Sequence, residues 1–530
     1  MAFLLQQLIL QSAQRTPDAP ALLFKQDTWS YQQLREEVGR VASGLRRIGI
    51  ARDQRVAVYL PKQFETVTSM FGTMAAGGVF VPVNPILKPE QVGHILRDCT
   101  TSVLITSADR ARLLSDTLAD CPDLKQLVVT DGEAPELAGD SDLSVCSWQQ
   151  MLGEAQLPVL RRIDADMAAI LYTSGSTGRP KGVVLSHRNM LAGAQSVATY
   201  LNNTAADRLL AVLPFSFDYG LSQLTTAFSV GASVVLMDYL LPRDVIRAVA
   251  RYTVTGLAAV PPLWNQLAGL PWPDEAVASL RYITNSGGAM PVATTAQLQA
   301  ALPNTSVFLM YGLTEAFRST FLAPDQVKVR PESMGKAIPN ADIMVVRPDG
   351  SECDVDEPGE LVHRGALVSL GYWGDREKTD IRFKPAPGQP EGIHNPELAV
   401  WSGDQVRRDA EGFLYFIGRN DEMIKTSGYR VSPGEIEEVV FQVPGVEQAV
   451  AFGAPHPQLG YGIVLVVQAA AGSVDADAIL AHCKIHLPMF MLPGYLDLAS
   501  ELPRNPNGKI DRKALSMRFA EVFLPPQGSS

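Results

Sequence analysis

The sequence has 530 residues, of which 46% are hydrophobic and 19% are charged, and it carries a formal net charge of −11 with a pI of about 5.3. This length exceeds what a single hydrophobic core supports, so two or more domains are expected. The acidic balance argues against a nucleic-acid-binding protein, and it means that an anionic ligand would have to be attracted by a local site.

The chain begins without a recognisable targeting segment. Its first residues lack the basic region and the long apolar core of a signal peptide, and no apolar run is long enough to cross a bilayer. The five cysteines are scattered and odd in number, which is typical of a reducing compartment rather than of a disulfide framework. We therefore expect a cytoplasmic protein without membrane insertion.

Helical and strand patterns alternate over the first 150 residues. Apolar residues recur at helical spacing over residues 3–14 and 31–48, and residues 21–31 between them predict a small hairpin. A buried strand is expected over residues 55–60. The stretch 131–142 is acidic and rich in small residues, and we expect it to be a surface loop.

A glycine-rich segment over residues 173–182 follows the apolar run 167–172. Small residues let backbone N–H groups point into a concave space, hydroxyl groups add donors, and Lys181 adds a point charge suited to phosphate. It is not a Walker loop, because Arg179 and Pro180 separate the last loop glycine from the lysine, which another glycine follows. The segment predicts a polyphosphate cradle, and the alternative is a flexible surface loop.

The middle of the chain predicts a parallel sheet covered by helices on both faces, an α/β fold. Strands are expected over residues 209–213, 233–237, 256–260, 281–285 and 306–310, with helices over residues 222–230, 243–252, 261–270 and 291–302. Ligands of such sheets bind beyond the carboxyl ends of the strands. Thr173, Asn285 and Tyr311 lie at such ends, so we expect them to converge on one edge.

The pattern of predicted elements changes after residue 328. Short strands separated by turn signals predict a small β-rich subdomain over about residues 328–417. From residue 420 a new βαβ-like pattern begins, with helices over residues 434–442 and 475–486 and strands over residues 446–453 and 463–468. We place a domain boundary between residues 419 and 420, which gives an N-terminal domain of residues 1–419 and a small α+β C-terminal domain of residues 420–530.

Two short segments combine residues suited to a nucleotide. In residues 311–315, Tyr-Gly-Leu-Thr-Glu, an aromatic ring can stack on a base, and the carboxylate of Glu315 can hold Mg²⁺. In residues 401–404, Trp-Ser-Gly-Asp, the carboxylate of Asp404 can accept two hydroxyl donors at once. The alternatives are a core tyrosine with a solvated glutamate, and an aspartate in a turn.

Together with residues 424–437 and 502–515, these segments resemble, in order, the motifs of the AMP-forming adenylating enzymes. That superfamily comprises acyl-CoA synthetases, nonribosomal peptide adenylation domains and luciferases. The resemblance covers nearly the whole chain, and it implies a large N-terminal adenylate-forming domain followed by a mobile C-terminal domain that carries the catalytic lysine. Residues 218–223, 256–264 and 456–460 look like those of the exosortase A-associated acyl-CoA ligase subgroup.

The resemblance implies roles for individual residues. The catalytic residues would be Lys509, Thr314, Glu315, Lys425 and Arg430, with Glu315 also binding the metal. ATP or AMP would be bound by Thr173, Ser174, Gly175, Ser176, Thr177, Gly178, Lys181, Gly287, Gly288, Ala289, Tyr311, Gly312, Asp404 and Arg419. Lys509 would neutralise the charge that develops as pyrophosphate leaves, Asp421 would be the hinge of a domain rotation, and the loop at Gly428 would open a tunnel for a thiol.

The acyl pocket implied by the resemblance comprises Phe217, Asp218, Tyr219, Ser222 and Asn285. Many CoA ligases carry histidine where this chain has Phe217, whereas peptide synthetase domains carry Phe-Asp, and their aspartate binds the α-ammonium of the substrate. Asp218 matches that aspartate. A cationic acid is therefore one possibility, and the alternative is that Asp218 caps the helix expected to start near Ser222 or pairs with a local donor.

The activity implied is ATP- and Mg²⁺-dependent activation of a carboxylic acid as an acyl-AMP, followed by transfer to CoA. The main alternative is a stand-alone amino-acid adenylating enzyme that loads the phosphopantetheine of a separate acyl carrier protein. A remote alternative is a non-catalytic adenylate-binding protein. The partners expected are the acid, ATP, and CoA or the carrier protein, with no nucleic acid.

Overall fold

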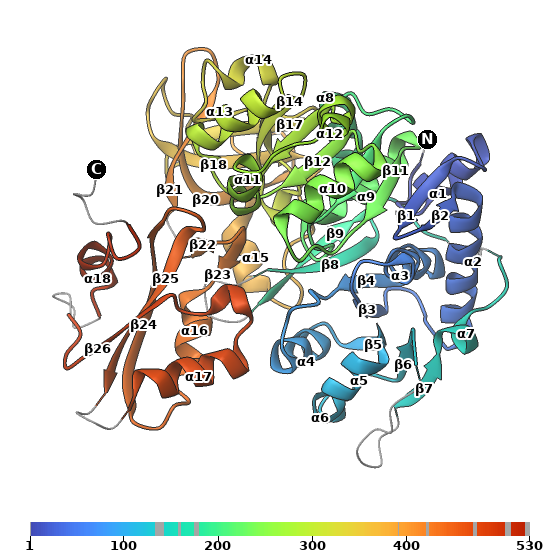
Figure 1. Cartoon of the computed structure of the whole chain (residues 1–530), viewed down its shortest axis with the longest axis horizontal. Helices are drawn as coiled ribbons and strands as arrows, with labels where there is room; N and C mark the ends of the chain where they lie inside the picture. Colours follow the sequence, from blue (N-terminus) through green and yellow to red (C-terminus); the bar gives the residue numbers. More distant parts are fainter. Residues whose placement is uncertain are drawn as a thin grey trace.

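The computed structural model describes residues 2–132, 143–156, 161–173, 180–390, 392–419, 423–469, 474–503 and 510–524, without the side chain of Arg419. These residues form three sheets (Figure 1). Two large sheets are built before residue 420, and a smaller sheet is built from strands after residue 423. The predicted loop over residues 131–142 lies almost wholly outside the described residues.

The N-terminus forms two helices around a hairpin, as predicted. Helix α1 (Gln7–Arg15) precedes β1 (Pro20–Phe24) and β2 (Asp27–Ser30), and α2 (Tyr31–Arg47) follows. Ser30 fixes the start of α2 through a capping box, in which its side chain accepts a hydrogen bond from the Gln33 N–H and its own N–H donates to the Gln33 side chain.

The first large sheet has seven strands in the order β7-β6-β5-β3-β4-β8-β9. Their bounds are β3 (Arg55–Tyr59), β4 (Val79–Pro82), β5 (Thr101–Thr106), β6 (Gln126–Val129), β7 (Ser144–Ser147), β8 (Met167–Thr173) and β9 (Lys181–Ser186). The strands are parallel except for β9, which pairs antiparallel with β8 and places Lys181 opposite Thr173. The two ends of the glycine-rich segment therefore lie side by side.

The second large sheet has fourteen strands. Its path is β17-β18-β20-β21-β16-β15-β14-β13-β12-β10-β11-β1-β2, with β19 paired to β20. The new bounds are β10 (Arg208–Ala211), β11 (Ser233–Leu236), β12 (Gly256–Ala259), β13 (Tyr282–Asn285), β14 (Ser306–Tyr311), β15 (Thr320–Leu322), β16 (Ser333–Ala337), β17 (Ala341–Val346), β18 (Gly359–Gly365), β19 (Phe383–Pro385), β20 (Leu398–Arg408) and β21 (Leu414–Arg419). The predicted strands from β10 to β14 are parallel, whereas β15 to β21 are antiparallel and continue the same hydrogen-bonded sheet.

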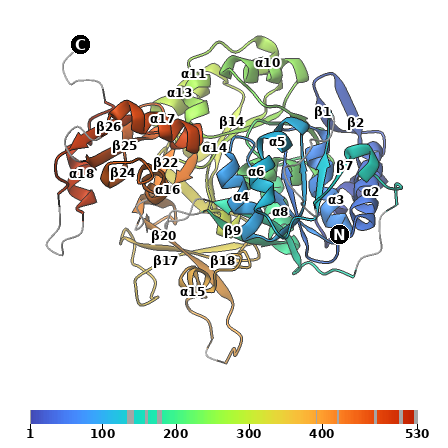
Figure 2. The same cartoon turned by 90° about the horizontal axis from the view of Figure 1, so that it is seen from below.

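Helices fill the space between the large sheets and cover their outer faces (Figures 1 and 2). The inner core joins strands of both sheets to α2, α3 (Phe64–Ala76), α8 (His187–Tyr200) and α9 (Asp218–Val230). Successive residues of β3 point to opposite faces, so Val56 and Val58 enter this inner core while Ala57 and Tyr59 enter an outer one. The outer core of the seven-stranded sheet is covered by α4 (Pro89–Asp98), α5 (Ala108–Leu113) and α6 (Ser115–Ala119).

Several further helices connect the strands. They are α7 (Trp148–Met151), α10 (Pro242–Tyr252), α11 (Pro261–Ala268), α12 (Asp274–Ser279), α13 (Val292–Ala301), η1 (Thr314–Ala316), α14 (Pro324–Val327) and α15 (Arg376–Arg382). The short helices α12 and α15 were not predicted, because six or seven residues are too few to show a helical period.

The C-terminal sheet has the order β23-β22-β25-β24, with β26 paired to β25, and it encloses a core of its own. Its elements are β22 (Ile424–Thr426), β23 (Tyr429–Val431), α16 (Pro433–Val440), β24 (Val446–His456), β25 (Gly460–Ala469), α17 (Ala476–His486), η2 (Met489–Met491), β26 (Tyr495–Ala499) and α18 (Arg512–Arg518). The predicted boundary between residues 419 and 420 stays a prediction. Within the described ranges, no helix combines the length and apolar character needed to span a bilayer.

Two local alternatives raised by the sequence are wrong. Helix α9 begins at Asp218 itself, with Phe217 as its N-cap residue, so Asp218 cannot cap a helix that starts near Ser222. The helix starts early because Gly220 lets it approach the preceding chain, where an added Cβ would lie 2.0 Å from the Pro214 carbonyl oxygen. Asp404 does not lie in a turn, because it belongs to the long strand β20.

Candidate active site

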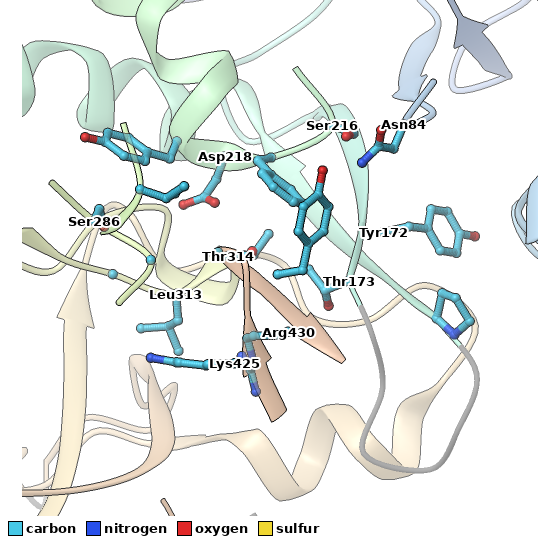
Figure 3. Close-up of a pocket in the computed structure, with 18 of the residues that line it drawn as sticks. Asn84, Tyr172, Thr173, Ser216, Asp218, Ser286, Leu313, Thr314, Lys425 and Arg430 are labelled. Carbon is cyan, nitrogen blue, oxygen red and sulfur yellow. The ribbon is translucent and has the colours of Figure 1, made fainter. Parts of the chain in front are cut away.

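A cavity of about 160 Å³ lies where the two large sheets meet the C-terminal sheet (Figure 3). A single water needs roughly 10–15 Å³ on this measure, so the space suits a small molecule. Thr173 reaches it from β8, Tyr311 and Thr314 from the end of β14, and Asp218 from α9. The predicted convergence on one sheet edge is thus corrected, since Thr173 and Tyr311 belong to different sheets that face the same cavity.

A buried cluster of charges joins those two sheets. The Nζ of Lys181, in β9, lies 3.1 Å from Oε1 of Glu315, in η1. It also donates to the Tyr372 hydroxyl at 2.6 Å, and that hydroxyl donates to Glu315 Oε1 at 2.7 Å. Tyr372 is held beside β9 by a bridge to Val183. The cluster therefore fixes the carboxylate and the ammonium in one geometry next to the glycine-rich segment.

The carboxylate of Glu315 is only 2% exposed. Burial alone would raise its pKa, but the charges of Lys181, Arg430 and Arg382 outweigh burial and hold the pKa well below its usual range. Burial lowers the pKa of Lys181, and Glu315 opposes that change. Oε2 of Glu315 has no hydrogen-bond partner among the described residues, which leaves one buried oxygen for a ligand.

Tyr311 and Asp404 form a second pair across the large sheet. The Tyr311 hydroxyl donates to Oδ2 of Asp404, and the backbone N–H of Asp404 donates to the Ser402 hydroxyl at 3.1 Å. Both Tyr311 and Asp404 line the cavity. Asp404 pairs in register with Arg419 of β21, whose backbone alone is described.

The third wall comes from the C-terminal sheet. The hairpin of β22 and β23 brings Lys425, Gly428, Tyr429 and Arg430 to the cavity, and Figure 3 shows Lys425 and Arg430 reaching it from these strands. Gly428 adopts a left-handed φ of +81°, and an added Cβ would lie 2.9 Å from the Val260 side chain. The Tyr429 ring stacks at 3.8 Å on Phe490 of the 3-10 helix η2, so aromatic packing within the C-terminal part supports this end of the hairpin.

The start of α9 supplies the wall on the side of the predicted acyl pocket. Phe217, Asp218 and Tyr219 line the cavity, and the Phe217 ring meets Tyr429 edge-on at 4.8 Å. Burial raises the pKa of Asp218, and the charge of Arg318 opposes that rise. Asp218 therefore faces a cationic side chain of the protein itself.

Ser222 and Asn285 are not among the residues that line the main cavity. Ser222 lines a smaller cavity behind it, and its hydroxyl accepts a hydrogen bond from Arg318. The Asn285 amide donates to the Gly288 carbonyl at 3.0 Å and so braces the turn after β13. Gly287 and Gly312 do line the cavity, whereas Gly288 and Ala289 lie in the turn beside it.

Seven predicted site residues lie outside the described ranges. They are Ser174, Gly175, Ser176, Thr177, Gly178, Asp421 and Lys509.

Comparisons with known proteins agree with this geometry. A family model described as "AMP-binding enzyme" matches residues 9–373, and one described as "AMP-binding enzyme C-terminal domain" matches residues 435–509. The chain belongs to the AMP-binding enzyme family. The motif-based prediction of a member of the α/β AMP-forming adenylating enzymes is therefore confirmed. The narrower exosortase A-associated subgroup stays a prediction.

The relatives of this family member fall into two groups. It is 28% identical over 514 residues to tyrocidine synthase 3 of Brevibacillus parabrevis, covering 96% of this chain but only 8% of that protein. It is also 28% identical over 535 residues to a long-chain-fatty-acid–CoA ligase of Escherichia coli O157:H7, covering 95% of this chain and 92% of the ligase. A solved structure of a variant o-succinylbenzoate CoA synthetase from Bacillus subtilis matches with a TM-score of 0.82 and 25% identity, covering 96% and 98% of the two chains.

Two residues of this family member's site were missed by sequence reasoning. Tyr372 joins the charge cluster, and Arg318 lies at the floor of the cavity. The signal for Arg318 was present, since a charged residue stands among small and apolar residues shortly after Glu315. Nothing local marks Tyr372, because its role depends on a contact with β9 that is distant in sequence.

Proposed function

We propose that this chain activates a carboxylic acid with ATP as an acyl-AMP, releasing pyrophosphate, and then transfers the acyl group to the thiol of CoA. The observation that best supports this is the Lys181–Glu315–Tyr372 cluster, a preset pair of opposite charges beside the glycine-rich segment. Polyphosphate and a divalent cation would give each member of the pair a partner of opposite charge.

In the first half-reaction, a carboxylate oxygen of the acid attacks the α-phosphorus of ATP, and the bond to pyrophosphate breaks. Tyr311 would pack on the adenine, while Asp404 would accept hydrogen bonds from the ribose hydroxyls with Arg419 beside it. Thr173, Lys181 and residues 174–178 would hold the phosphates, and Lys509 would neutralise the charge that develops. Thr314 lines the cavity next to Glu315 and would donate to the phosphate of the adenylate.

Glu315 fits a role as a Mg²⁺ ligand. Its Oε2 is a buried oxygen without a partner among the described residues, and carboxylate oxygens are the ligands that Mg²⁺ prefers. The cation, when bound, would neutralise phosphate charge and favour the departure of pyrophosphate. Burial opposes ionisation of Glu315, but the charges of Lys181, Arg430 and Arg382 lower its pKa and so favour the carboxylate form that a cation needs.

In the second half-reaction, the thiol sulfur attacks the acyl carbon, AMP leaves, and the thiol proton is released. The hairpin that carries Lys425, Gly428 and Arg430 stands over the cavity in this structure, as expected for the thiol-accepting arrangement. Arg430 contributes to the low pKa of Glu315 and would hold the adenylate phosphate. Asp421 would be the hinge between this arrangement and the one in which Lys509 enters.

Transfer to a separate carrier protein is the second candidate, and the peptide synthetase relatives favour it. The shared chemistry is a pantetheine thiol, so the acceptor does not alter the roles given to the residues above. The CoA ligase relative and the solved o-succinylbenzoate CoA synthetase support CoA as the first acceptor to test.

ATP–pyrophosphate exchange over a panel of fatty, aryl and amino acids tests this proposal, with thioester formation on CoA scored in parallel. Lys509→Ala should abolish exchange with little change in melting temperature. The matched control is Lys513→Ala, an exposed lysine of α18 that should retain exchange. Exchange that persists in Lys509→Ala would overturn the catalytic assignment, and a preference for amino acids without CoA product would favour the carrier-loading candidate.

A further inference from the structure

Arg318 is a buried cation that no described carboxylate contacts, although the charge of Asp218 acts on it from the same wall of the cavity. Its side chain is 1% exposed, and it is among the largest fully buried side chains of the described chain. Within those residues its guanidinium donates to two hydroxyls only, at 3.2 Å to Ser222 and 3.4 Å to Ser286, and Nε has no partner. No described carboxylate lies within 4.0 Å of it.

Burying a charge that is neither paired nor fully hydrogen-bonded is costly, so such a residue is retained where a ligand completes its coordination. A guanidinium presents planar pairs of donors that match a carboxylate. Arg318 lines the main cavity and therefore reaches ligand space directly. Its other neighbour is the Tyr219 ring, whose centroid lies 4.8 Å away, a contact that orients the group but does not neutralise it.

The residue before Arg318 has an uncommon backbone conformation. Phe317, the preceding residue, has a left-handed φ of +56° although it is neither glycine nor asparagine, and it is fully buried. The surrounding core enforces this conformation, with the Phe317 ring packed against Gly193 so closely that an added Cβ there would lie 2.4 Å from it. Strain of this kind persists where a functional side chain must be positioned.

Arg318 also closes the acyl end of the cavity. The smaller cavity beyond it encloses only about 10 Å³, enough for one water, and is lined by Tyr219, Ser222 and Thr284. The far end of a bound acid therefore meets the guanidinium rather than passing it. Asp218 lines the same wall, and the charge of Arg318 acts on its carboxylate, so Asp218 is not left without a cation when no substrate ammonium is bound.

We infer that Arg318 forms an anion subsite at the end of the acyl pocket, and that the substrate is a compact carboxylic acid with a second carboxylate. This inference rests on the proposed function, since it names the acid which that reaction would activate. It also argues against the cationic acid that the position of Asp218 suggested.

The test is ATP–pyrophosphate exchange with short dicarboxylic acids, namely the series from malonic to suberic acid, and phthalic acid. Each diacid is compared with its monomethyl ester, which has lost one carboxylate, and with an amino acid of similar length. The wild type should show a kcat/KM about tenfold to a hundredfold higher for the best diacid than for its ester, as expected for a charge-assisted bond. Arg318→Met should remove that preference while retaining exchange with the ester, and Arg318→Lys should keep part of it. Arg247→Met, at an exposed arginine on α10, is the matched control and should behave as the wild type.

The outcomes separate the two proposals. Equal use of diacid and ester by the wild type, a preference for amino acids, or a diacid preference that survives in Arg318→Met would overturn the anion subsite. Exchange with monocarboxylic acids alone would overturn the subsite and leave the proposed function standing. Absence of exchange with every acid, ester included, would overturn the proposed function itself. Circular dichroism and melting temperature identify a variant that fails to fold, and Arg318→Lys then supplies the comparison.

Discussion

Replacing Gly428 by alanine should separate the two half-reactions. In the present arrangement the added Cβ would lie 2.9 Å from one Val260 atom and 3.0 Å from two others, closer than carbon atoms approach in folded proteins. Overpacking of this kind costs about 1–3 kcal/mol. The cost applies only while the hairpin of β22 and β23 stands against Val260, so it penalises the thiol-accepting arrangement and spares the other.

The corresponding loss in thioester formation is about 5- to 150-fold, since each 1.4 kcal/mol is about tenfold. ATP–pyrophosphate exchange, which reports the first half-reaction, should stay within about twofold of the wild type. The two activities are measured on the same preparation, with exchange of labelled pyrophosphate and chromatography of the CoA thioester. A fall confined to the second assay is the expected result.

Alanine at Gly428 also adopts an unfavourable backbone conformation, which must be distinguished from the collision. Gly412 serves as the matched control, because its φ is +85° and an added Cβ would meet nothing within 4 Å. Gly412→Ala should leave both half-reactions unchanged, and Val260→Ala in the Gly428→Ala background should restore part of the thioester activity. Equal loss of both half-reactions in Gly428→Ala, or full thioester activity, would refute this account of the hairpin.

Three further predictions concern other parts of the fold. Glu315→Gln removes the negative charge that pairs with Lys181, and it removes a carboxylate oxygen that could bind Mg²⁺. The Mg²⁺ concentration for half-maximal exchange should therefore rise by about tenfold or more. An unchanged Mg²⁺ titration would contradict the metal assignment. Asp404→Asn keeps the shape but loses a charged acceptor, so the KM for ATP should rise about tenfold with the KM for the acid unchanged. Burial lowers the pKa of His187 from 6.5 to about 4. As the pH falls, this histidine is therefore protonated in the unfolded chain before it is protonated in the folded one. The contribution of His187 to the free energy of unfolding should drop by about 3 kcal/mol between pH 6.5 and pH 4. Denaturant titrations of the wild type and His187→Gln test this, and a slope that is the same in both would rule out His187 as its source.

The local hydrophobic patterns of the sequence were sufficient to predict the parallel strands. The segments that became β10 to β14 alternate with helices of ordinary length, and each is a short run of apolar residues bounded by turn signals, so the strands and their parallel arrangement follow from the pattern. Their order in the sheet, in which β10 lies between β12 and β11, was not predicted. The start of α9 was placed four residues late, because Asp218 and Tyr219 are poor helix formers and the close approach at Gly220 is a tertiary contact.

The candidate site was predictable only as a set of segments. Motif spacing indicated Lys181 and Glu315 separately, but the ion pair between them spans 134 positions and depends on two different sheets meeting. Arg318 was passed over although it stands among small and apolar residues, because that signal is weak: a single arginine in such surroundings can be solvated or buried. The left-handed conformation of Phe317 beside it is a tertiary feature that no composition or period encodes.

The two large sheets and the C-terminal hairpin form the three walls of the cavity. The contacts between these walls explain how one site could serve two reactions. The buried ion pair of Lys181 and Glu315 connects the two large sheets, and it holds a fixed geometry because separating it would leave charges uncompensated. The hydrogen bond of Tyr311 to Asp404 links two strands of the fourteen-stranded sheet and fixes that wall from within. The hairpin of the C-terminal sheet meets the cavity through the ring of Tyr429, against Phe217 at 4.8 Å, and through Arg430, whose charge lowers the pKa of Glu315. A ring pair is worth only about 0.5–1.5 kcal/mol beyond its burial, so it is regained at modest cost after the surfaces part and return. The nucleotide side of the site can therefore stay rigid while the wall that carries Gly428 is exchanged, which is the property that a two-step transfer through an acyl-AMP requires.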